Sequence, residues 1–197
     1  LCVSQNSPIL IVTTSTRAAN ELTEELISYE GSNGVINFPA WETLPHERLS
    51  PKSDTVTARF KALNNIKNSE TKFVVCSIRA LLQPIIANDL ENSQIKIKQS
   101  QSIKMLDLIE QLSKFGYTRS DLVEKRGDFA VRGGIVDLFL PLSHHPIRID
   151  FFGDEIEDLS YFEVADQRTF KTVVGAVEIY PCRELLLDTA IKHRAIE

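Results

Sequence analysis

Basic residues are concentrated in one segment of a chain that is otherwise mildly acidic. The formal net charge of the whole chain is -5, yet segment 116–141 contains Arg119, Lys125, Arg126 and Arg132. An arginine offers a planar fork of donors to a carboxylate, and arginine near an aromatic side chain commonly anchors protein interfaces. The segment therefore predicts a surface that binds a partner protein. The alternative is an ordinary charged face in contact with solvent.

The alternation of side chains along a strand indicates where these groups point. In the run DFAVR we expect Phe129 and Val131 on one face and Ala130 and Arg132 on the other. If Phe129 packs in the core, Arg132 points away from it. Phe139 is a weaker contact candidate, because an apolar strand position usually belongs to the core.

A second candidate site lies where the first expected strand meets the first expected helix. Thr14, Thr16 and Arg17 stand at this junction. Hydroxyl groups and an arginine at a helix start can bind a phosphate, because the unpaired N–H groups and the helix dipole favour an anion. Ser15 or Thr16 can instead cap the helix, with Arg17 in solvent, and the residues alone favour this simpler interpretation.

Motifs of common catalytic sites are absent from the sequence. There is no GxxxxGK[ST] loop to hold ATP phosphates, no GxSxG turn and no HExxH pair. His144 and His145 precede a proline, and no further residue nearby has metal-ligand spacing. The acidic run 154–158 fits the solvent-exposed face of a hairpin. We therefore expect no catalytic residue, no cofactor and no metal site in this chain.

Composition limits the class of protein further. A pI of about 5.5 argues against a protein that coats duplex DNA, which needs a basic surface. The three cysteines are far apart and form no CxxC pair, which favours a reducing cytoplasm. No apolar run is long enough to span a membrane. Because Leu1 replaces an initiating Met, we expect the chain to be part of a longer protein.

The first 85 residues or so have the element order of an open α/β layer with a parallel sheet. The expected strands are 8–13, 35–38 and 73–77, and helical spacing begins near residues 17, 56 and 78. The first strand is apolar throughout, so we expect it to be buried on both faces. Three prolines within 38–51 exclude regular structure there, and Trp41 is expected to anchor this loop.

The following residues alternate instead, as in a small antiparallel α+β unit. Strand patterns occupy 95–97, 129–139, 147–152 and 156–162, with a Gly153-Asp154 turn before the last. An amphipathic helix is expected over 102–115. Its apolar side is expected to contain Ile103, Leu106, Ile109 and Leu112, and Gly116 is expected to end it.

Three longer segments resemble a known family. FPAWETLPHERLSPKSDTVTARFKAL, residues 38–63, is similar to the loop and helix of bacterial transcription-repair coupling factors (Mfd). RGDFAVRGGIVDLF and IRIDFFGDEIEDLSYFEVADQRT are similar to the segment that this family shares with the excision-repair subunit UvrB. The resemblance covers essentially all 197 residues, and motifs of this length are specific.

The resemblance implies functions that residue spacing does not show. A full-length member is implied to be an ATP-driven DNA translocase, with ATP and Mg²⁺ as its cofactors, that displaces stalled RNA polymerase and recruits excision repair. RNA polymerase and DNA are implied to bind other parts of the full-length protein. This chain is implied to be non-catalytic and similar to domains 1a, 2 and 1b of UvrB, of which domain 2 binds the damage-recognition ATPase UvrA.

The implied fold class is α/β, with a degenerate RecA/helicase-like parallel-sheet layer and an inserted antiparallel α+β domain. We expect the layer over 1–88, the UvrA-docking domain over 89–170, and a return to the first layer over 171–197. By motif alignment, two arginines that bind UvrA in UvrB fall on Arg119 and Arg132. A third falls on Ala130, so we expect related but not identical contacts.

Two departures separate the chain from UvrB itself. Span 41–51 is too short for the β-hairpin with which UvrB clamps damaged DNA, and the nucleotide loop is degenerate in this family. We therefore expect neither damage clamping nor ATP hydrolysis. The TTSTR run resembles helicase motif Ia, and a nucleic-acid contact there is expected to be vestigial. A UvrB-like helicase domain and an autonomous nucleic-acid-binding domain remain the alternatives.

Overall fold

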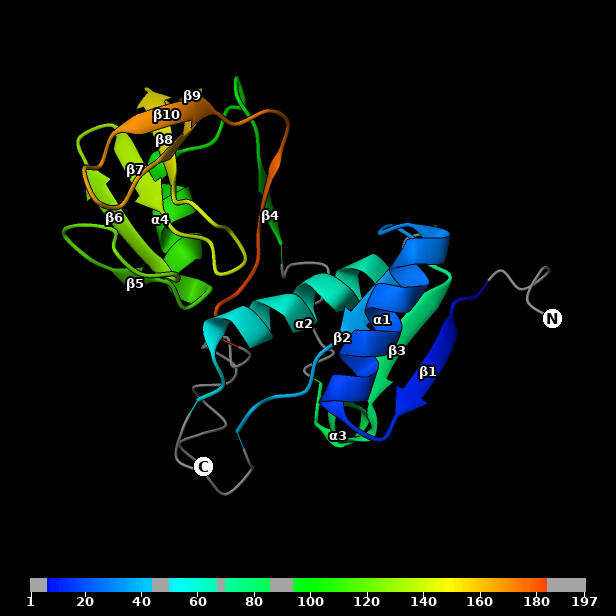
Figure 1. Cartoon of the computed structure of the whole chain (residues 1–197). Helices are drawn as coiled ribbons and strands as arrows, with labels where there is room; N and C mark the ends of the chain where they lie inside the picture. The colour runs from blue at the N-terminus through cyan, green and yellow to red at the C-terminus, as the bar shows by residue number, and fades with distance from the viewer. Residues whose placement is uncertain (1–6, 44–49, 67–69, 86–93, 184–197) are drawn as a thin grey trace. The chain divides into compact units, whose positions relative to one another are not determined.

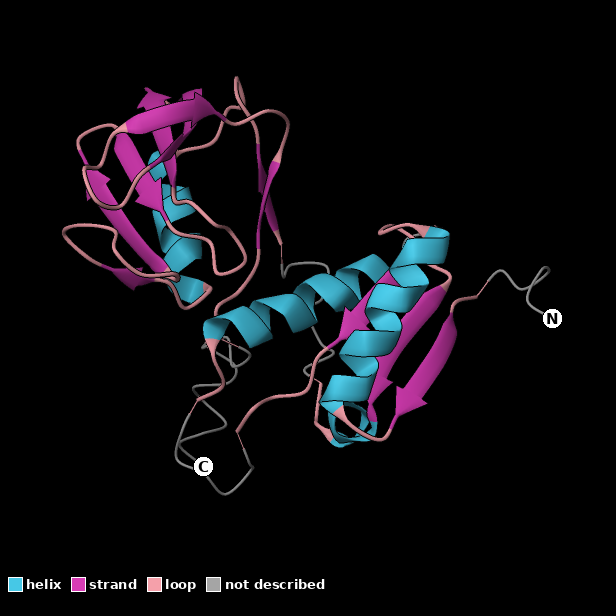
Figure 2. Ribbon diagram, in the orientation of Figure 1, coloured by secondary structure: helices cyan, strands magenta, loops and turns pink. Residues whose placement is uncertain are grey.

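The chain forms two compact units, residues 1–91 and residues 92–197. A computed structural model describes residues 7–43, 50–66, 70–85 and 94–183 (Figure 1). Helices and strands alternate in the first unit, whereas antiparallel strands dominate the second (Figure 2). The predicted α/β class, with a parallel layer and an antiparallel α+β unit, is confirmed.

The first unit is built on a parallel three-stranded sheet. Its strands, in the order β1-β3-β2, are Ile9–Thr13, Phe73–Ser77 and Val35–Phe38. Its helices are α1 (Thr16–Glu30), α2 (Ser53–Ile66) and α3 (Ile78–Leu82). Helix α1 packs on one face through Ala19 against Val35 and Val75. Helix α2 packs on the other face, where Ala62 joins Phe38 and Cys76.

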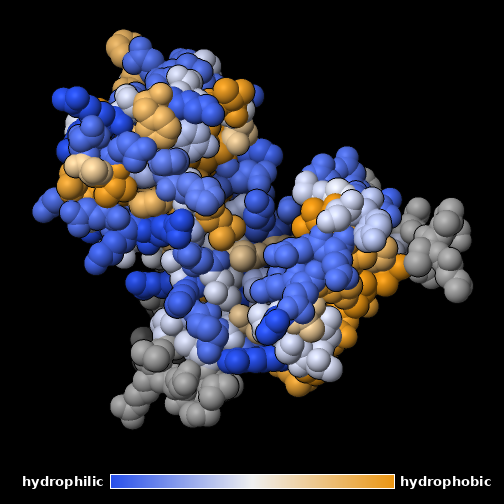
Figure 3. All heavy atoms as spheres, in the orientation of Figure 1, coloured by the Kyte–Doolittle hydropathy of each residue, from blue (hydrophilic) through white to orange (hydrophobic). Residues whose placement is uncertain are grey.

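Strand β1 is covered on one face only, so the expectation that both faces are buried is wrong. Leu10 and Val12 are 53% and 42% exposed. The reason is topological, because β1 is an edge strand while α2 packs over β2. Ile78, Leu81 and Leu82 of α3 are also exposed, and Figure 3 shows apolar atoms at the surface of this unit.

The loop that follows β2 is held by a buried arginine. Arg59 of α2 is only 2% exposed, and its guanidinium lies 4.4 Å from the Phe38 ring centre and 4.9 Å from that of Trp41. Its Nη1 donates to the Pro39 carbonyl at 2.9 Å and its Nη2 to the Pro84 carbonyl at 3.1 Å. The expected ordered loop is therefore present as far as residue 43, and residues 44–49 lie outside the described residues.

The second unit contains a six-stranded sheet in the order β10-β9-β8-β7-β6-β5. Its strands are β5 (Thr118–Arg119), β6 (Asp128–Arg132), β7 (Ile135–Leu138), β8 (Ile147–Phe152), β9 (Glu155–Phe162) and β10 (Thr169–Thr172). Neighbours are antiparallel except β5 and β6, which are parallel. The expected run 129–139 is thus two strands, separated at Gly133 and Gly134, and Gly133 has a positive φ of 59°.

Helix α4 (Met105–Lys114) closes one face of this sheet over the largest core. Leu108 and Leu112 are fully buried and meet Phe129, Val136 and other apolar strand residues. Leu106, expected on the buried side, is 73% exposed. The helix starts only at Met105, and its buried stripe runs 105, 108, 109 and 112, at the three- and four-residue steps of a helix.

Residues 171–183 stay in the second unit, which corrects the expected return to the first layer. Strand β10 pairs with β9, and β11 (Val177–Ile179) pairs with β4 (Ile95–Ile97). The alternating apolar residues of β4 and β11 are buried in the core of the second unit. The two strands pair with each other, so both find their backbone partner within this unit. Residues 184–197 of the expected segment lie outside the described residues.

Gly116 ends α4 as expected, and the packing shows why it must be glycine. Its φ is +82°, in the left-handed region that side chains disfavour. A Cβ at this position would lie 2.7 Å from Arg183 Cγ. The absence of a side chain at Gly116 therefore lets Arg183 pack closely against the end of α4.

Candidate partner-binding site

The face of the second sheet opposite α4 carries Arg132. Phe129 is fully buried in the core under α4, whereas the Arg132 side chain is 48% exposed, so the predicted direction of Arg132 is confirmed. This face is only partly in contact with solvent. A small cluster of buried apolar side chains covers part of it: Val123, Ala130, Phe139 and Phe162.

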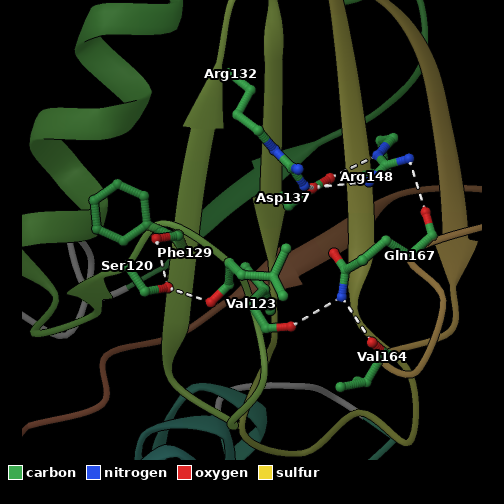
Figure 4. Close-up of polar contacts among 9 residues, drawn as sticks. Ser120, Val123, Phe129, Arg132, Asp137, Arg148, Val164 and Gln167 are labelled. Carbon is green, nitrogen blue, oxygen red and sulfur yellow. Dashed lines mark hydrogen bonds and ion pairs between the residues drawn. The ribbon is translucent and has the colours of Figure 1, made fainter.

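A buried carboxylate holds Arg132. Asp137 of β7 is 1% exposed, and its Oδ2 accepts a hydrogen bond from Arg132 Nη2 at 2.8 Å. Arg148 of β8, the cross-strand partner of Asp137, donates from Nε to Oδ1 at 2.7 Å and from Nη2 to Oδ2 at 2.9 Å. Figure 4 shows both guanidinium groups turned toward this one carboxylate. The hydrogen bond to Asp137 raises the pKa of Arg148 further, so Arg148 stays charged.

Gln167 connects this network to two loops. Its backbone carbonyl accepts a hydrogen bond from Arg148 Nη1 at 3.2 Å. Its side-chain Nε2 donates to the backbone carbonyls of Val164, at 2.8 Å, and Val123, at 3.4 Å (Figure 4). Gln167 has a positive φ of 60°, a conformation that costs free energy for a residue with a side chain. The turn after β9 is therefore fastened both to β8 and to the loop before β6.

That loop, residues 120–127, carries two of the predicted basic residues. It is held at one end by Ser120 Oγ, which donates to the Leu122 carbonyl at 2.8 Å, and at the other by Asp128, which accepts from Lys125 N at 3.0 Å. Lys125 and Arg126 are exposed. Arg126 Nε donates to the Ser143 carbonyl at 3.1 Å, and its guanidinium lies 5.9 Å from the Phe139 ring.

The predicted candidates differ in what they can offer a partner. Phe139 is 8% exposed and packs under the loop, so it supports the site instead of presenting a contact. Arg119 is exposed on the edge strand β5. Its register partner is Phe129, whose side chain lies on the face opposite Arg132. The two arginines matched to UvrB therefore lie near one edge of the sheet but on opposite faces of it.

The sequence reasoning missed Asp137, Arg148 and Gln167. A signal for Asp137 was present, because it is a single carboxylate within the apolar run IVDLFL. A charged residue at a core position of a strand requires an ionic partner. The sequence does not show which cation supplies it, since Arg132 and Arg148 come from two different neighbouring strands.

The second candidate element, at the start of α1, is a helix cap. Ser15 Oγ accepts from Ala18 N at 3.1 Å, which confirms the simpler interpretation. Arg17 is exposed and donates from Nε to Glu21 at 2.7 Å. Thr14 and Thr16 are exposed as well. A nucleic-acid contact through Thr14, Thr16 and Arg17 stays a prediction.

His145 makes local contacts with an acidic and an aromatic side chain. His145 Nδ1 lies 3.4 Å from Glu163 Oε1, and its ring meets Phe170 edge-on at 5.0 Å. In the described part of the chain, no group of three or more His, Cys, Asp or Glu side chains is arranged to hold a metal ion. Nor does any helix there have the length and apolar character to cross a membrane.

Asp150 of β8 carries an unfavourable charge near the site. Its cross-strand partner is another acid, Asp158 of β9. Burial raises the pKa of Asp150, and repulsion by Asp158 adds to this, while Arg148 acts in the opposite direction. The ionised form of Asp150 is therefore less favourable in the folded chain than in the unfolded one.

We expect Asp150→Asn to stabilise the chain at pH 7. A carboxyl whose pKa is raised by folding opposes folding while it is ionised, and the penalty disappears as the pH falls through the raised pKa. The gain should be on the order of 0.5 kcal/mol. Thermal unfolding from neutral to acidic pH measures it, with Asp154→Asn in the exposed neighbouring turn as the control. An Asp150→Asn protein no more stable than the parent at pH 7 contradicts this expectation.

Comparison with known proteins assigns this unit to a family. Residues 95–185, which contain the whole Arg132–Asp137–Arg148 network, match the family model of the UvrB interaction domain. The chain is a UvrB-like module of the kind found in transcription-repair coupling factors. The module is 38% identical to a transcription-repair-coupling factor of Mycobacterium bovis over 99% of its length. It is 31% identical to the Bacillus subtilis factor over 98% of its length, and 30% identical to the Escherichia coli factor over 93%.

The module spans 16% of the length of these relatives. The family match begins at the first residue of β4 and ends two residues after the last described residue, Arg183. The similarity to the coupling factors extends through the first unit as well, since it covers nearly all of the module. The comparisons therefore relate the second unit to the UvrB interaction domain, and nearly all of the module to one part of transcription-repair-coupling factors.

Proposed function

We propose that the module recruits UvrA, and through it nucleotide excision repair, by means of the basic edge of its second unit. The observation that carries the proposal is the position of Arg132 within the UvrB interaction domain. Its guanidinium is half exposed, and the carboxylate that it contacts is already paired with Arg148 in two hydrogen bonds. Arg132, Asp137 and Arg148 together carry one net positive charge.

Further exposed cations lie at the same edge of the sheet, with Arg119 on the face opposite Arg132. Arg119 on β5 and Lys125 and Arg126 in the 120–127 loop are all exposed. Several cations at one edge suit an acidic partner, because complementary charges guide encounter and orientation. Ala130, where UvrB has an arginine, is buried beneath the loop, so this module contacts UvrA with a smaller set of arginines.

The module itself is proposed to be non-catalytic and to bind neither ATP nor Mg²⁺. Translocation on DNA, ATP hydrolysis and contact with RNA polymerase are proposed for other parts of a longer protein. The module would then link a stalled transcription complex to the repair machinery by docking alone.

Titration of purified UvrA with the module tests the proposal. Arg132→Ala and Arg119→Ala should each weaken binding by about 30-fold, which corresponds to about 2 kcal/mol for an arginine at the centre of an interface. Folding stability should change by only about 0.5 kcal/mol, because both side chains are exposed. Arg17→Ala is the matched control, since Arg17 is an exposed arginine that is also paired with a carboxylate.

Two results would overturn the proposal. If both arginine variants bind UvrA as tightly as the parent, the docking surface lies elsewhere. If they lose binding together with their folded structure, the arginines stabilise the fold and the comparison with UvrB does not transfer.

A further inference from the structure

We propose that Asp137 and Arg148 are positioning residues, which hold the Arg132 guanidinium ready for its partner without neutralising it. The inference rests on the proposed function, because it concerns how the UvrA-binding arginine is presented. Neither Asp137 nor Arg148 was a candidate contact residue. Both are too buried to contribute much surface themselves, since Asp137 is 1% and the Arg148 side chain 18% exposed.

The charges of the three groups support this division of roles. Arg148 meets Asp137 through a two-point contact at 2.7 and 2.9 Å, so the carboxylate is neutralised from β8. Arg132 adds a single hydrogen bond at 2.8 Å to Asp137 Oδ2. A guanidinium has five N–H donors, so most of those on Arg132 are not used by this bond. The three side chains together keep one positive charge, and it lies on the exposed member.

The surroundings make the carboxylate a fixed point. Asp137 stands in the central strand pair β7–β8, and Arg148 is held from its other side by the Gln167 carbonyl at 3.2 Å. The Arg148 guanidinium also lies 4.9 Å from the Phe162 ring centre. Gln167 adopts its positive φ where this contact is made, which is the kind of local strain that a positioned site retains.

Pre-positioning of Arg132 should increase affinity. A flexible arginine loses rotamer freedom when it enters an interface, and a side chain already held in place loses less. The affinity gained from one immobilised side chain is up to about tenfold. Arg17 provides the contrast within the same chain, because its partner Glu21 is itself largely exposed on a helix surface.

The first measurement is nitrogen relaxation of the arginine Nε–H groups in the whole chain, without any partner. We expect Arg132 to have an order parameter near the rigid backbone value of about 0.85, and Arg17 to lie below about 0.6. In Asp137→Asn, Arg132 should become as mobile as Arg17. Equal mobility of Arg132 and Arg17 in the parent chain would overturn the proposal, whatever the variants do.

The second measurement is a double-mutant cycle on UvrA affinity. Asp137→Asn should weaken binding up to about tenfold in the parent but leave Arg132→Ala unchanged, because Asp137 acts only through Arg132. An equal loss in both backgrounds would assign Asp137 a general structural role and overturn the positioning role. If Asp137→Asn does not fold, Arg148→Lys replaces it, since a lysine keeps the charge but loses the two-point contact.

The cycle also separates this inference from the proposed function. If Arg132→Ala weakens binding while Asp137→Asn does not, UvrA docking stands and the positioning role is wrong. If Arg132→Ala itself leaves the affinity unchanged, docking through Arg132 is wrong, and positioning for docking is wrong with it.

Discussion

Replacing Arg148 with alanine is expected to lower the free energy of unfolding by about 3–5 kcal/mol, the usual cost of breaking a buried ion pair. The variant leaves the buried Asp137 carboxylate with the single hydrogen bond from Arg132. It also removes the donor to the Gln167 carbonyl and the contact with Phe162. By contrast, Arg132→Ala leaves the two-point contact of Arg148 intact and should cost about 0.5 kcal/mol.

Hydrogen exchange of the β7 and β8 backbone amides measures this difference, because it reports the local free energy of opening. The paired variants are the control for each other, since both remove an arginine from the same carboxylate. Equal loss of protection in Arg132→Ala and Arg148→Ala would mean that the two arginines contribute equally to stabilising the buried Asp137 carboxylate. The assignment of Arg148 as the structural partner would then be wrong.

Arg59→Ala is expected to lower the stability of the first unit by about 3 kcal/mol. Hydrogen bonds from a charged donor contribute about 1.5–3 kcal/mol each, and cation–π contacts of desolvated groups about 2 kcal/mol, against the cost of burying the guanidinium. Arg59 makes two such hydrogen bonds, to the Pro39 and Pro84 carbonyls, and lies over Phe38 and Trp41. Without it, both carbonyls lose this donor.

Urea unfolding measures this effect when it is followed by the fluorescence of Trp41, the single tryptophan of the sequence, whose ring contacts Arg59. Arg59→Lys is the matched control. It keeps the positive charge but cannot reach both carbonyls in one plane, so an intermediate loss is expected. An unchanged midpoint in Arg59→Ala would show that the loop is held by other contacts and that Arg59 does not determine its stability.

Local patterns in the sequence were sufficient for the elements and for one key direction. Alternation in DFAVR placed Phe129 in the core and Arg132 on the opposite face, as the structure shows. The strands at 35–38 and 73–77 lie where the sequence predicted them. Motif resemblance indicated the family, because the two runs shared with UvrB extend from β6 to the start of β10. Composition alone does not distinguish this family from other α+β proteins.

The tertiary structure decided what covers each face and which charges meet. Periodicity showed that Leu10 and Leu106 belong to regular elements, but their exposure depends on where α2 packs and where α4 starts. Residues 171–183 stay in the second unit because β11 finds its partner in β4, about 80 residues earlier in the chain. The carboxylate of Asp137 is matched by arginines from two neighbouring strands, and such pairing exists only once the register is set. The sequence by itself therefore determined the family and the exposed arginine, whereas long-range strand pairing decided how that arginine is held.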